Sequence, residues 1–74
     1  MIKQEDFLEF VAALFEVEKG AISMASEYML IPQWDSVMHL RLVMELEARF
    51  GVQIPLERIS ELRTLGSIYE LISK

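Results

Sequence analysis

The chain carries a complete signature for one helix between Asp35 and Gly51. Asp is a strong N-cap because its carboxylate accepts hydrogen bonds from amides of the first turn. Gly suits the left-handed position just after a helix C-terminus. Between these two residues, apolar side chains recur at the spacing of an amphipathic helix. The sequence therefore predicts a helix over Val37 to Phe50, and the rest of a small chain must pack around it.

This helix would carry apolar side chains on two arcs, because successive helical residues advance by about 100°. The arc expected to face a core contains Leu42, Val43, Leu46 and Phe50. The second arc contains Val37, Leu40 and Met44, with Arg41 and Glu47 at its edges. Two interpretations of the second arc are open. The long loop before the helix covers it, or it is a docking patch with an apolar centre and a charged rim.

The remaining segments predict a small all-α domain. Helical periodicity indicates a first helix over about Gln4 to Val17, with Gly20 suited to its end. Residues 18 to 35 show no period but are rich in apolar side chains, so we expect a long loop lying against the core. A short helical segment over Leu56 to Leu62 and a last helix over Leu65 to Ser73 complete a four-helix bundle.

Composition narrows the class of partner. The 74 residues are enough for a single domain, residues 1–74, and 12 acids against 7 bases give a net charge of −5. Nucleic-acid binding needs a basic stripe and is therefore not expected. A basic protein surface would suit this charge. The N-terminus lacks a signal peptide's apolar run, and no stretch is long enough to span a membrane. We expect a cytoplasmic monomer.

Ser36 directly follows the predicted N-cap. A hydroxyl at the positive end of a helix dipole suits a phosphate, although an ordinary first-turn serine is the alternative. The chain has no cysteine, which excludes a thiolate nucleophile or a thiolate metal site. A hydrolase built on Ser36 and His39 would lack an orienting acid beyond the histidine. We therefore expect neither an enzyme nor a metal centre.

The sequence around this serine resembles the acyl and peptidyl carrier proteins. Asp35-Ser36-Val37 is similar to the Asp-Ser-Leu signature of that family. The run from Leu42 to Pro55 resembles the rest of the family's second helix and the loop after it. The segment from Thr64 to Ile72 resembles the last helix, so the match covers essentially the whole chain.

The resemblance implies that Ser36 carries a 4′-phosphopantetheine arm, transferred from coenzyme A by a separate Mg²⁺-dependent transferase. The arm's thiol would hold an acyl or aminoacyl group as a thioester. Asp35 would assist loading by helping to bind the transferase's metal. The implied partners are this phosphopantetheinyl transferase, an acyl- or aminoacyl-loading ligase and downstream acyl-processing enzymes. The alternative is an unmodified helical protein-interaction module that has kept the fold.

The chain departs from the family pattern both before the serine, where Leu30-Ile31-Pro32 also replaces an Asp-Leu-Gly run, and on the second helix. Gln33 and Trp34 replace small residues before the Asp-Ser pair, and Arg41 and Ala48 replace acids of the second helix. Because Arg41 would repel a basic partner surface, we expect dedicated partners in a secondary-metabolite or amino-acid-loading pathway. Trp34 either shapes the surface around the arm or anchors the loop to the core.

The predicted partner face comprises Trp34, Val37, Leu40, Arg41, Met44, Glu47 and Ile54. His39 is the single histidine and lies within the core arc of the same helix. It is interpreted as a partly buried, hydrogen-bonded residue, and pH-sensitive packing is the alternative.

Overall fold

The computed structural model describes residues 2–73. Its helical elements follow in the order α1 (Gln4–Phe15), η1 (Lys19–Ala21), α2 (Ser36–Phe50), η2 (Leu56–Glu61) and α3 (Leu65–Ile72). The α elements are α-helices, and the η elements are short 3₁₀ helices. The predicted all-α bundle is confirmed: three longer helices, a short one between α2 and α3, and a long first connection. The turn η1 inside that connection was not predicted.

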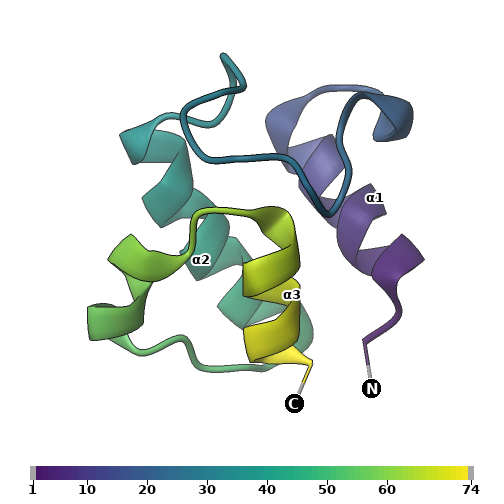
Figure 1. Ribbon diagram of the computed structural model, residues 1–74. Helices are drawn as coiled ribbons and strands as arrows, with labels where there is room; N and C mark the ends of the chain where they lie inside the picture. The colour runs from purple at the N-terminus through teal and green to yellow at the C-terminus, as the bar shows by residue number, and fades with distance from the viewer. Residues whose placement is uncertain (1, 74) are drawn as a thin grey trace.

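The first connection crosses one end of the three α-helices, and the start of α1 lies near the end of α3 at the other (Figure 1). At that second end the hydroxyl of Tyr69 donates to the carbonyl of Ile2, which ties α3 to the segment before α1. The rings of Phe7 and Tyr69 also pack together, with centroids 5.4 Å apart. None of the helices in residues 2–73 has the length and hydropathy needed to cross a membrane.

Helix α1 ends earlier than predicted, at Phe15. Glu16 takes a left-handed conformation with φ of 60°, and the amides of Glu16 and Val17 donate back to carbonyls of the last turn. This arrangement normally uses glycine, because a side chain makes positive φ unfavourable. The expectation that Gly20 ends the helix is wrong, since Gly20 lies in η1.

The ends of α2 and α3 follow from local sequence. Asp35 Oδ1 accepts from the amide of Met38 at 2.9 Å, and Gly51 adopts a left-handed φ of 64°. The predicted cap residues of α2 are confirmed. At the start of α3, Thr64 and Ser67 bond to each other's amides at 3.0 and 3.2 Å, which completes a capping box.

The core draws on the three α-helices, the first connection and the segments on either side of η2. Its buried residues are Phe7, Val11, Ala12, Phe15, Ile22, Trp34, Leu42, Val43, Leu46, Ile54, Leu62, Leu65, Ile68 and Ile72. The predicted core arc of α2 is confirmed, with Phe50 half-buried at its end. Ile22 and Trp34 come from the first connection, so this long segment lies against the core as expected.

A backbone ladder joins the first connection to the segment that leads into α3. Three hydrogen bonds form it: Tyr28 N to Arg63 O (2.8 Å), Leu65 N to Ser26 O (3.1 Å) and Gly66 N to Met24 O (2.8 Å). Glu27 and Thr64 are paired between them as an antiparallel bridge. Because these bonds satisfy backbone groups of a segment without helical structure, they hold the first connection in place.

A candidate site at the start of helix α2

Ser36 is the first residue of α2 and is exposed to solvent. Asp35 uses Oδ1 to cap the helix through the amide of Met38. Within the described residues, neither the Ser36 hydroxyl nor the Val37 amide makes a hydrogen bond. The positive end of the helix dipole therefore faces solvent beside an available hydroxyl, an arrangement that stabilises an attached anion.

Trp34 lies beneath this site and not on its surface. Its side chain is 0% exposed, and its indole packs against the rings of Phe15 and Tyr28 with centroids 5.9 and 5.8 Å away. The prediction that Trp34 belongs to the partner face is therefore wrong, and its interpretation as a loop anchor is right. Burial of a large ring removes apolar area from water, and the indole N–H is satisfied internally.

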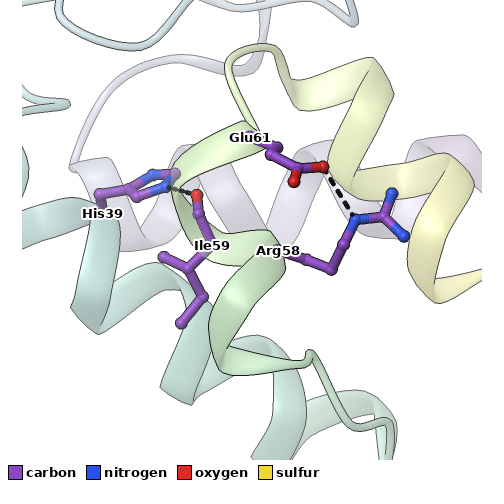
Figure 2. Close-up of polar contacts among 4 residues, drawn as sticks. All are labelled: His39, Arg58, Ile59 and Glu61. Atoms are coloured by element: carbon purple, nitrogen blue, oxygen red, sulfur yellow. Dashed lines mark hydrogen bonds and ion pairs between the residues drawn. The ribbon is translucent and has the colours of Figure 1, made fainter.

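His39 supplies the partner for that indole. Trp34 Nε1 donates to His39 Nδ1 at 3.0 Å. On the other side of the ring, His39 Nε2 lies 2.8 Å from the carbonyl oxygen of Ile59, as Figure 2 shows. An indole only donates and a carbonyl only accepts, so this pattern requires a neutral imidazole with its proton on Nε2. His39 thus connects the first connection, α2 and η2. The interpretation of His39 as a hydrogen-bonded interior residue is confirmed.

A cavity of about 460 Å³ adjoins Ser36 between α2 and η2. Besides Ser36 it is lined by Tyr28, His39, Leu40, Leu56, Ile59, Ser60 and Arg63. A larger hollow of about 720 Å³ is lined by Met44, Glu47 and the loop after α2, but Ser36 does not line it. Of these two, the smaller cavity contains the candidate attachment residue.

The second apolar arc of α2 faces solvent. Val37, Leu40 and Met44 are 77%, 56% and 64% exposed, so the interpretation that the loop covers them is wrong. Leu56 in η2 is 80% exposed and also lines the cavity beside Ser36. We call Val37, Leu40, Met44 and Leu56 the apolar patch. No sequence signal distinguishes Leu56, because its three-residue spacing from Ile59 makes it equally able to face inward.

The other predicted partner-face residues separate into exposed and structural ones. Arg41 is exposed and pairs with Glu45 at 3.9 Å. Glu47 is half-buried, and its Oε2 accepts from the amide of Ile54 at 2.7 Å, which fixes the loop after α2. The prediction that Ile54 lies on the partner face is wrong, because its side chain is 6% exposed and packs in the core. Arg41 therefore remains at the surface, paired with Glu45, whereas Glu47 is engaged in the fold.

Residues 34–72 match the family described as the phosphopantetheine attachment site. This match covers more than half of the chain, including Ser36 and every residue of α2, η2 and α3. The chain belongs to that family. It is similar to the acyl carrier proteins of Tropheryma whipplei strains Twist and TW08/27. Each is 25% identical over 75 residues, which cover 96% of this chain and 92% of the relative.

The chain is thus a carrier protein whose cofactor is covalently attached 4′-phosphopantetheine, and the interaction-module alternative is not favoured. The residues fit that group. Ser36 presents an exposed hydroxyl at a helix N-terminus, where a phosphodiester is stabilised. The adjoining cavity has no carboxylate among its lining residues, so it would not repel the phosphate.

Proposed function

We propose that this carrier holds an acyl or aminoacyl group as a thioester on a 4′-phosphopantetheine arm bonded to Ser36 Oγ. The observation that carries the proposal is the exposed, uncommitted hydroxyl of Ser36 at the first residue of α2. Similarity to acyl carrier proteins along nearly the whole chain supports an acyl cargo. When bound, the arm supplies a thiol, a group that a chain without cysteine otherwise lacks.

Two features of the carrier itself, the N-terminus of α2 and the side chain of Asp35, act at the attachment point. The N-terminus of α2 stabilises the phosphodiester on Ser36 through its dipole and its first-turn amides. Asp35 keeps that helix end in place through Oδ1. We assign its second oxygen, Oδ2, to the Mg²⁺ of the phosphopantetheinyl transferase during loading, since carboxylate oxygens are preferred Mg²⁺ ligands.

We further propose that the apolar patch, with Arg41 at its rim, binds the partner enzymes. A contiguous exposed apolar area with charged edges is typical of a protein interface. Arg41 adds positive charge beside the patch, which opposes binding to a strongly basic partner surface. The partners we infer are a transferase, a loading ligase and acyl-processing enzymes dedicated to a secondary-metabolite pathway. The carrier would meet them as a cytoplasmic monomer.

Intact mass measurement tests the attachment. The purified carrier is incubated with coenzyme A, Mg²⁺ and a broad-specificity phosphopantetheinyl transferase, and we expect one phosphopantetheine group per chain. Ser36→Ala should abolish the gain. Ser60→Ala is the matched control, because Ser60 is also exposed and lines the same cavity. A gain that persists in Ser36→Ala, or none in the unchanged protein, would refute the assignment.

A further inference from the structure

The cavity beside Ser36 differs from the rest of this acidic surface in its charge. The chain contains 12 acids, yet no acid lines this cavity. Arg63 does line it. Among the described residues, the ion pairs are Lys19–Glu9, Arg41–Glu45 and Arg58–Glu61, and none includes Arg63. The cavity therefore offers a positive charge that the fold does not neutralise by a direct ion pair.

The other lining side chains define what else an occupant would meet. Leu40, Leu56 and Ile59 provide an apolar wall. His39 adds only its ring, because Trp34 and Ile59 use both of its nitrogens. Once Ser36 carries the arm, the polar ends that remain are the hydroxyls of Tyr28 and Ser60 and the guanidinium of Arg63, all of which can donate hydrogen bonds to oxygen. The site thus suits a short apolar segment that ends in an oxyanion.

We infer that this cavity seats a short thioester cargo ending in a carboxylate, with Arg63 as the residue that selects it. The inference rests on the proposed attachment at Ser36. A guanidinium is permanently charged and matches a carboxylate with two parallel hydrogen bonds. A simple aminoacyl cargo presents an ammonium group, which the positive charge of Arg63 would repel and which no carboxylate of the cavity could pair with. The volume of about 460 Å³ falls within the range of roughly 300 to 1,000 Å³ of small-ligand pockets, larger than a phosphate requires.

Three cargoes of similar length test the selection. The ¹⁵N-labelled carrier is loaded from succinyl-, pentanoyl- and β-alanyl-coenzyme A, which present a carboxylate, a methyl group and an ammonium. Intact mass confirms each loading. Amide shifts of Leu40 and Ile59 and the Nε–H shift of Arg63 are then compared with those of the unacylated arm. We expect the succinyl form to shift all three signals, and the other two forms to leave the Arg63 signal unchanged.

Arg63→Gln and Arg58→Gln are the matched variants. Both arginines are exposed, but Arg58 pairs with Glu61 and does not line the cavity. Tyr28 bonds to the backbone carbonyl of Arg63, so the substitution keeps the backbone ladder. Because an accessible ion pair contributes up to about 1 kcal/mol, the seated fraction of the succinyl arm should fall about two- to five-fold in Arg63→Gln. It should not change in Arg58→Gln.

Several results would overturn the inference. Equal shifts with all three cargoes, or equal effects of the two variants, would remove Arg63 as the selecting residue. A shift of the Arg63 Nε–H signal when the unacylated arm is attached, with no further change on adding a cargo, would assign Arg63 to the arm's phosphodiester instead. If no cargo changes the Arg63 signal, Arg63 does not contact the cargo, and its charge would instead be available to an acidic residue of a partner protein. The intact mass is measured before any spectrum is recorded. If it shows no gain, the proposed attachment at Ser36 is refuted, and not the selection by Arg63.

Discussion

The hydrogen bond between Trp34 and His39 gives the sharpest test of how this fold supports its site. His39→Ala removes the acceptor for an indole N–H on a residue that is 0% exposed. A buried donor without a partner costs about 1–3 kcal/mol, and the lost imidazole volume adds about 1 kcal/mol of cavity cost. The expected loss in the free energy of unfolding is therefore about 2–4 kcal/mol. Such a loss is a large part of the roughly 4–11 kcal/mol expected for a domain of this size.

Urea denaturation, followed by circular dichroism, measures this loss from the transition midpoint and slope. A double-mutant cycle isolates the bond. In a Trp34→Phe background no indole N–H exists to be left unsatisfied, so His39→Ala should cost about 1–3 kcal/mol less there than in the unchanged protein. His39→Gln should cost less than His39→Ala, because an amide can both accept and donate. If His39→Ala lowers the free energy of unfolding equally in both backgrounds, the reasoning is refuted, because the hydrogen bond from the indole to the histidine would then not stabilise the fold.

Three further predictions concern α3, the N-cap and the apolar patch. Gly66→Ala should lower the melting temperature, because its Cβ would lie 3.0 Å from the fixed carbonyl oxygen of Met24. Gly20→Ala is the control and should be neutral, because no atom beyond its chain neighbours lies within 4 Å of its Cβ; an unchanged melting temperature in Gly66→Ala would contradict the prediction. Asp35→Asn should keep the cap and thus stability, yet slow loading in the mass assay; unchanged loading would exclude the metal role. Met44→Glu, at a 64% exposed position, should change stability by less than about 0.5 kcal/mol but weaken binding of a processing enzyme in titration calorimetry; unchanged affinity would exclude Met44 from the interface.

The sequence predicts those features that depend on neighbouring residues. Asp35 and Gly51 bound α2 because capping is decided within one turn, and the core arc follows from helical spacing. Ser36 could be singled out for the same reason. The end of α1 could not be predicted, because Glu16 adopts a conformation that its residue type disfavours.

Features that join distant segments could not be read from the sequence. A large apolar residue beside a site can point inward or outward, and only the packing around Trp34 and Ile54 shows that both are buried. The cavity at Ser36 is built from three segments, and Arg63 reaches it from after η2. No local pattern predicts this proximity, because it depends on backbone hydrogen bonds that carry no side-chain signature.

The backbone ladder has a consequence for how the chain reaches its final form. Its bonds join residues 24–28 to residues 63–66, so α2 and Ser36 lie within one closed loop of the chain. Pairings between such distant segments form slowly, because loop-closure entropy is lost before the contacts compensate for it. We expect α3 to dock late in folding. A nascent chain that still lacks residues 63–66 would then hold the first connection loosely, and its serine would become a well-ordered substrate for the transferase only after those residues have been synthesised and have paired.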